Sequence, residues 1–167
     1  MVQVAKKHLA VEDTELWKLM RTPLPSVIDQ KTKPYRPTLT ELWHIFDLVN
    51  EYIFDNQLPK PIIEMKAIRY YGKCTGLVET KHVLHHARLT LYPKYFCIQW
   101  AIMIMAHEMA HQYQWDVDGP DRIRSGKRPL LSHGPTFFKF QKKLAQFGIP
   151  LRVKYCPVTW LQTQNNF

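Results

Sequence analysis

The sequence predicts an α+β domain in which a small β-sheet packs against one long helix and two further helices. Apolar residues recur at helical spacing in three segments, 37–54, 94–114 and 135–147. Short alternating runs rich in Ile, Val, Thr and Tyr fill the region between the first two of these segments. The 167 residues, 46% hydrophobic and 22% charged, fit one soluble domain with a sizeable core.

The chain is expected to begin with an appendage or linker, residues 1–37, followed by the domain proper, 38–167. Within the appendage, residues 12–20 favour a short helix and the rest an extended connector. The first long helix begins at a capping box formed by Thr38 and Glu41. Its buried stripe is expected to consist of Leu42, Ile45, Phe46, Val49, Tyr52 and Ile53.

The three predicted strands lie within 62–71, 74–80 and 87–92. A histidine-rich stretch precedes the third strand, and its members are His82, His85 and His86. Their spacing has little precedent as a complete set of metal ligands, so we place them on a turn or strand end.

The second long helix is expected to cover 94–114, and a polar loop rich in Gly and Pro follows it over 116–132. The last helix, 135–147, has Pro135 at its first position and Gly148 as its stop signal. Residues 149–156 then favour a strand.

Several classes of protein are disfavoured. The longest apolar run, Ile98–Ala106, is interrupted by Gln99 and is too short to span a bilayer. The N-terminus does not resemble a signal peptide, so we expect an intracellular protein with no membrane partner. The cysteines Cys74, Cys97 and Cys156 form no CxxC pair, and free thiols are expected.

The net charge of +9 is concentrated in the C-terminal third. Between Gly119 and Trp160 the only acidic residue is Asp121, whereas the basic residues are Arg122, Arg124, Lys127, Arg128, Lys139, Lys142, Lys143, Arg152 and Lys154. Such one-sided charge favours a nucleic-acid partner, with a solvated basic face as the alternative. Phe138 and Trp160 are candidates for stacking on bases. The helical spacing of other residues assigns them to the core, namely Phe137, Phe140, Leu144 and Phe147.

The second long helix contains the run HEMAH, in which His107 and His111 are separated by one helical turn. Both imidazoles can therefore face one zinc ion, and Glu108 lies close enough to act on a water bound to it. The flanking residues indicate a helix buried on most sides, where two His and one Glu are costly unless a metal or hydrogen bonds satisfy them. A structural, hydrogen-bonded histidine pair is the alternative.

A catalytic zinc requires a third protein ligand and a position left for water. No Glu follows Glu108, and Gln114 and Val117 occupy the positions of the compact pattern HExxHxxGxxH. His133, presented by Gly134 and the proline after it, is the expected third ligand. The alternatives are Asp116, Asp118 and Asp121.

The residues AHEMAHQY, followed by a loop and SHGPTF, resemble the SprT-like (Spartan-type) zinc metalloproteases over roughly 38–147. The resemblance implies a zincin-like core and a single catalytic Zn²⁺ held by His107, His111 and His133, with Glu108 as the catalytic base. It also implies an endopeptidase that cleaves DNA-bound proteins, with single-stranded or damaged DNA as a second partner. Many family members carry a cysteine-rich ribbon after the protease core, and no such cysteines occur here. The expected DNA contacts therefore fall on Arg122, Arg124, Lys127, Arg128, Lys139, Lys142 and Lys143, or on a partner.

Two other functions are consistent with the same residues. One is a nucleic-acid or protein-binding module with a non-catalytic zinc, and the other is a zinc protease unconnected with DNA. For an enzyme, an edge strand is expected to bind extended peptide. The oxyanion donor is not determined, with Tyr113, His85 and several Arg residues as candidates. The sequence does not predict an oligomeric state.

Overall fold

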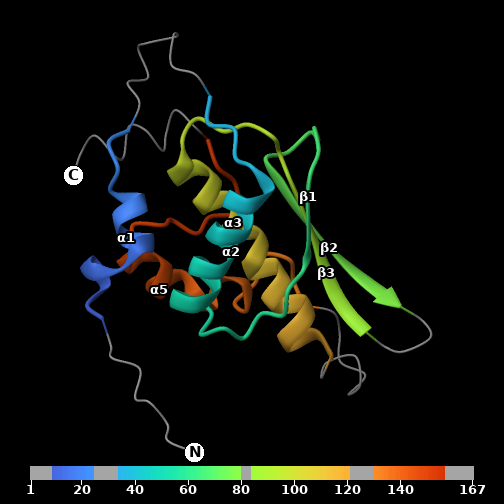
Figure 1. Cartoon of the computed structure of the whole chain (residues 1–167). Helices are drawn as coiled ribbons and strands as arrows, with labels where there is room; N and C mark the ends of the chain where they lie inside the picture. Colours follow the sequence, from blue (N-terminus) through green and yellow to red (C-terminus); the bar gives the residue numbers. More distant parts are fainter. Residues whose placement is uncertain (1–8, 25–33, 80–83, 121–129, 157–167) are drawn as a thin grey trace, which may run out of the picture.

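The computed structural model describes residues 9–24, 34–79, 84–120 and 130–156, with the backbone alone at 77–79 and 84–86. It confirms a mixed α+β architecture with a three-stranded sheet (Figure 1). The α-helices are α1 (Glu15–Met20), α2 (Leu39–Tyr52), α3 (Ile98–Tyr113) and α5 (Gln141–Gln146). Two short 3-10 helices, η1 (Val11–Asp13) and η3 (Phe137–Phe140), and a π-helical turn, η2 (Gln114–Asp118), accompany them. The strands are β1 (Ile62–Met65), β2 (Gly72–Glu79) and β3 (Leu84–Leu91).

The sheet has the strand order β1-β3-β2. Strand β3 pairs in parallel with β1 and antiparallel with β2. Side chains alternate between the two faces of a strand, and Ala87, Leu89 and Leu91 of β3 are fully buried on the face that contacts α3. Strand β2 lies at one side of the sheet, and within the described part of the chain its outer edge has no strand beside it.

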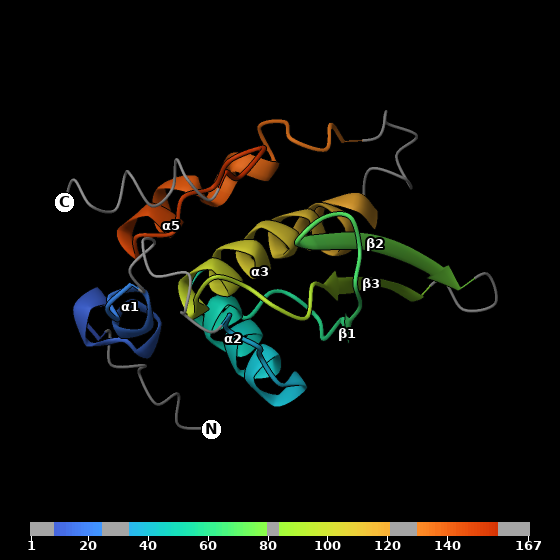
Figure 2. The ribbon, with the colours of Figure 1, turned by 90° about the horizontal axis from the view of Figure 1, so that it is seen from above.

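Helix α3 runs through the middle of the molecule, with α2 on one side and α5 on the other (Figure 2). Nearly all its side chains are buried, and Trp100, Ile102 and Met103 are among the largest of them. Its polar residues His107, Glu108 and Gln112 are therefore surrounded by protein. Of the helices described, none has the length and apolar character needed to cross a membrane.

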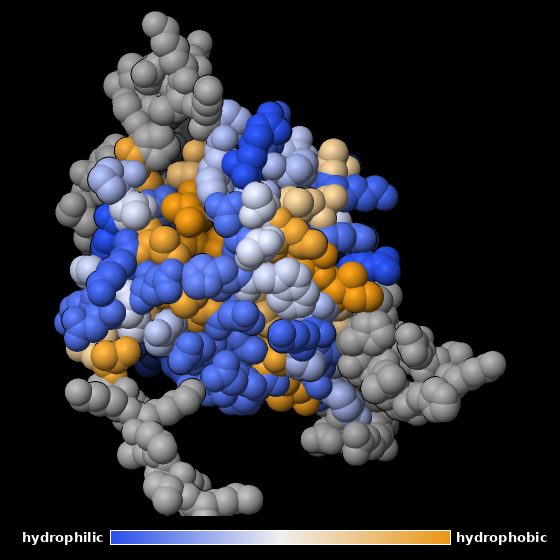
Figure 3. Space-filling model, viewed as in Figure 1, coloured by the Kyte–Doolittle hydropathy of each residue, from blue (hydrophilic) through white to orange (hydrophobic). Residues whose placement is uncertain are grey.

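Helix α2 begins at the predicted capping box, in which Thr38 accepts from the Glu41 N–H and Glu41 accepts from the Thr38 N–H. The stripe faces the core as expected, while His44 is half exposed and lies 2.7 Å from Glu15 of α1. On the face of the molecule that Figure 3 shows, hydrophilic residues predominate over the lower part. After α2 the chain turns at Asp55 and Asn56, which adopt positive φ angles of 54° and 58°.

The structure corrects both boundaries of the predicted 94–114 helix. Its regular part begins only at Ile98, because Tyr95 forms a two-residue antiparallel bridge with Tyr35, with both N–O distances 2.8 Å. At the other end, the prediction of a loop from residue 116 is wrong. The chain stays helical through the π-turn η2 and on to Pro120.

The C-terminal part differs as well. Pro135 lies in a turn before the helix, which begins as η3 and continues as α5. Gly148 ends it with a φ of 76°, as expected. Residues 149–156 do not form the predicted strand, because the chain folds back on itself. The Tyr155 hydroxyl donates to the Pro150 carbonyl at 2.9 Å and accepts from the Arg152 N–H at 3.2 Å.

Candidate metal centre and cleft

Three histidines from two parts of the chain meet in the structure. His107 and His111 lie one turn apart on α3, and His133 comes from the turn before η3. One nitrogen of each ring lies within 4.8 Å of the others, a spacing that allows all three to bind one metal ion. The sequence-predicted set therefore forms a group that can hold a metal ion. No other group of three or more potential ligands was found in the described part of the chain, and Asp116 instead accepts a hydrogen bond from Gln112 at 3.0 Å.

The histidine cluster also contains buried ring nitrogens without a hydrogen-bond partner. His107 Nδ1 and His133 Nε2 are buried and make no hydrogen bond of ordinary geometry with the described residues. A buried polar atom without a partner is costly, and a cation nearby removes part of that cost. Burial, together with the neighbouring His111 and His133 rings, lowers the pKa of His107 to about 3, and burial likewise lowers that of His111 to about 4. Both imidazoles are thus neutral at physiological pH, the state that metal ligation requires.

Phe137 forms the apolar side of this centre. Its ring is fully buried, and its centroid lies 4.9, 4.6 and 4.8 Å from those of His107, His111 and His133. The predicted core position of Phe137 is confirmed, but its contact with all three imidazoles could not be read from helical spacing alone.

Glu108 lies beside the cluster, beneath strand β2. A Cβ built on Gly72 would come within 2.9 Å of Glu108 Cγ and 3.0 Å of Oε1, so the strand backbone passes directly over the carboxyl group. Burial raises the pKa of Glu108 to about 7, and a hydrogen bond from the Cys74 backbone opposes this rise in part. A carboxyl group of this kind exchanges a proton near neutral pH, as a general base or acid must.

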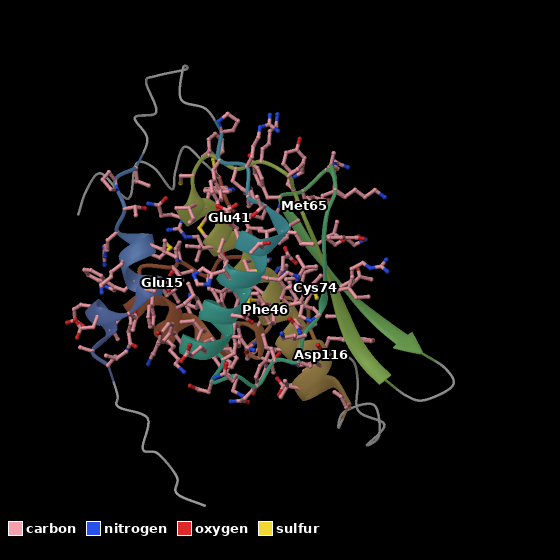
Figure 4. All side chains as sticks on the ribbon, viewed as in Figure 1. Glu15, Glu41, Phe46, Met65, Cys74 and Asp116 are labelled. Atoms are coloured by element: carbon pink, nitrogen blue, oxygen red, sulfur yellow. The ribbon has the colours of Figure 1, made fainter. Side chains whose placement is uncertain are left out.

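A cavity of about 1150 Å³ connects these groups. Its lining includes Glu108 and the three histidines, residues of β2 and the segment 153–155. Figure 4 labels Cys74 on β2 and Asp116 on η2. Burial raises the pKa of the partly buried Cys74 thiol, and the carboxyl groups of Glu108 and Asp116 raise it further. Because residues of β2 line the cavity, it lies along an edge strand of the sheet. Its volume is large enough for a segment of peptide.

The basic residues predicted to contact nucleic acid are only partly described. Arg122, Arg124, Lys127 and Arg128 lie outside the described residues. Lys139 donates to the Tyr113 hydroxyl at 3.0 Å, and Lys143 forms a 2.7 Å ion pair with Asp55. Lys142 is exposed. None of these three lysines lines the cavity.

Of the suggested oxyanion donors, the arginines are represented in the lining of the cavity by Arg69. The Tyr113 hydroxyl bonds to Gln57 at 3.1 Å and to Lys139, and Tyr113 does not line the cavity. The side chain of His85 lies outside the described residues. Tyr155 also lines the cavity, and its ring lies 5.4 Å from that of His107. Sequence reasoning assigned Tyr155 to a strand, and only the folding back of residues 149–156 brings it here.

Comparisons of the chain with known protein families, with curated proteins and with solved structures found no match.

Proposed function

We propose that the protein is a zinc-dependent endopeptidase with a zincin-like core of the SprT-like type. The observation that carries the proposal is the placement of buried Glu108 beside a three-histidine cluster, inside a cavity that follows an edge strand. The raised pKa of Glu108 supports the proposal, because a binding module with a purely structural metal has no use for a buried carboxyl group at this position.

In this mechanism His107, His111 and His133 hold the metal, and an extended peptide lies along β2. Zinc held there would supply Lewis acidity, which favours attack on a peptide carbonyl and lowers the pKa of water. Glu108 accepts the proton of the attacking water and passes it to the leaving nitrogen. Glu108 and Phe137 are both buried, which limits the access of bulk water to this proton transfer.

The proposed substrates are proteins bound to DNA inside the cell. The support is the excess of basic residues in the C-terminal third, together with the resemblance of the two histidine motifs. Among Lys139, Lys142 and Lys143, Lys142 is the one most available to phosphate, since Lys139 and Lys143 already contact Tyr113 and Asp55. Single-stranded DNA is expected to bring enzyme and substrate together, with an affinity that falls as salt rises.

The test compares wild type with Glu108→Gln, both loaded with zinc, on a basic DNA-binding protein with and without single-stranded DNA. Because Glu108 is not a ligand, the variant should retain one zinc per chain and lose cleavage. Cleavage by the wild type alone supports the peptidase, and stimulation by DNA supports the proposed substrate class. If both proteins hold zinc and bind DNA but neither cleaves, the binding module replaces this proposal. Cleavage without salt-sensitive DNA binding would leave a protease unconnected with DNA.

A further inference from the structure

Gln114 is a buried residue at the end of α3 whose side-chain amide forms three hydrogen bonds. One is with His111, and the other two are with residues on either side of His133. Gln114 Nε2 donates to the Leu131 carbonyl at 3.0 Å and to the Thr136 hydroxyl at 2.8 Å. Its Oε1 lies 3.2 Å from His111 Nδ1. The side chain thus joins one histidine of the cluster to the turn that carries another.

The Leu131 carbonyl determines which way the amide points. A carbonyl oxygen can only accept, so the amide group facing it must be the NH₂. The oxygen of Gln114 is then directed at His111, and an oxygen can only accept there. His111 Nδ1 must therefore carry the proton, which leaves Nε2 with a free lone pair.

The same carbonyl also closes the turn that contains His133. Leu131 accepts from the Gly134 N–H at 3.1 Å, and this bond encloses Ser132 and His133. A second donor, the Gln114 amide, holds that carbonyl against the end of α3. The distance between His133 and the two helical histidines is thus set in part by Gln114.

We infer that Gln114 is a positioning residue that prepares the metal centre before metal arrives, by fixing the tautomer of His111 and by anchoring the turn of His133. The inference rests on the proposed function only in taking the three histidines as a zinc site. The tautomer itself is a property of the metal-free protein.

Gln112 provides a matched control on the same helix. It is also a buried glutamine, but its amide donates to the Pro59 carbonyl at 2.8 Å and to Asp116 at 3.0 Å, away from the cluster. Gln112→Leu therefore removes a buried amide without touching His111.

The experiment records the ring-nitrogen NMR signals of the full metal-free chain at neutral pH, with His111 assigned from a His111→Asn spectrum. Wild type should show His111 protonated at Nδ1. In Gln114→Leu that tautomer should cease to dominate, and the affinity for zinc, measured by chelator competition, should fall by about 10- to 100-fold. Gln112→Leu should change neither the tautomer nor the zinc affinity.

Gln114→Glu keeps an acceptor facing His111 but replaces the donor that meets Leu131. It should preserve the Nδ1–H tautomer and still weaken zinc binding, because the turn of His133 loses its anchor. Wild type and this variant decide the question even if Gln114→Leu does not fold. Protonation of wild-type His111 at Nε2, or an unchanged tautomer in Gln114→Leu, would overturn the inference, and so would loss of the tautomer in Gln114→Glu. Failure of wild type to bind zinc would instead count against the proposed function and leave the tautomer result standing.

Discussion

Glu108 is a carboxyl group held between an apolar helix and the backbone of a strand. Only 6% of it is exposed, and desolvation outweighs the one backbone hydrogen bond that favours the charged form. The folded protein therefore binds a proton at Glu108 more tightly than the unfolded chain does. The free energy of unfolding should therefore depend on pH, and the substitution Glu108→Gln should remove the part of this dependence that comes from Glu108.

In the metal-free protein, unfolding releases the Glu108 proton between the ordinary carboxyl pKa of 4.5 and the folded value of about 7. The contribution of Glu108 to stability is thus lost as pH rises through this interval, by about 3 kcal/mol in total. Glu108→Gln lacks the effect, so its advantage over wild type should grow from near zero at the acidic end to that value above pH 7. Urea unfolding with a chelator present, at a series of pH values, measures it.

His107 and His111 serve as the internal reference for this comparison. Their lowered pKa values mean that both proteins lose stability as pH falls below 6.5, and this common loss cancels in the difference. A difference between the two proteins that is flat with pH would show that Glu108 is solvated in the folded state.

At the scale of elements, strand β2 packs closely on α3 and η2 because it carries small residues on its inner face. A Cβ on Gly76 would lie 2.1–2.6 Å from three atoms of the Trp115 ring. The π-helical turn η2 places that indole under the strand, and such turns recur at functional sites. Strand and helix end are thus held at the separation that defines the cavity.

Gly76→Ala should therefore destabilise the fold by roughly 1–3 kcal/mol, because neither the ring nor the strand can move freely. Thr75→Ala is the control, since the neighbouring residue faces the opposite side of the sheet. Both variants are compared by urea unfolding and by zinc affinity. If Gly76→Ala lowers the free energy of unfolding no more than Thr75→Ala does, β2 does not pack closely against Trp115.

The same elements show why the sequence predicted some features and not others. His107 and His111 were predictable because helical spacing alone brings them together, and His133 because few other ligands remained downstream. The π-turn was not, since Asp116, Gly119 and Pro120 are typical of loops, and the contacts of η2 with β3 and with the turn at 131–136 join segments far apart in the sequence. Gln114 and Tyr155 lacked any motif, because their roles depend on hydrogen bonds and packing between distant segments.

At the scale of the whole molecule, the N-terminal segment packs on the core through helix α1. Leu16 of α1 is fully buried among core residues, and α1 contacts both α2 and α3. Farther along, Gln99 of α3 donates to the Thr22 carbonyl at 2.7 Å and to its hydroxyl at 2.6 Å. These contacts show that residues 9–24 pack beside α2 and α3.

Leu16→Ala should accordingly cost about 2–5 kcal/mol of unfolding free energy, as for other large-to-small changes in a close-packed core. Leu9 provides the matched control, because the same substitution at a side chain that is 58% exposed should change stability by only about 0.5 kcal/mol or less. Urea denaturation of both variants measures the contrast, and zinc affinity measures whether the loss reaches the metal centre through α3. Equal effects of the two substitutions would mean that α1 is dispensable to the core. A large effect of Leu16→Ala alone would make the first helix a structural support of the helix that carries His107, Glu108 and His111.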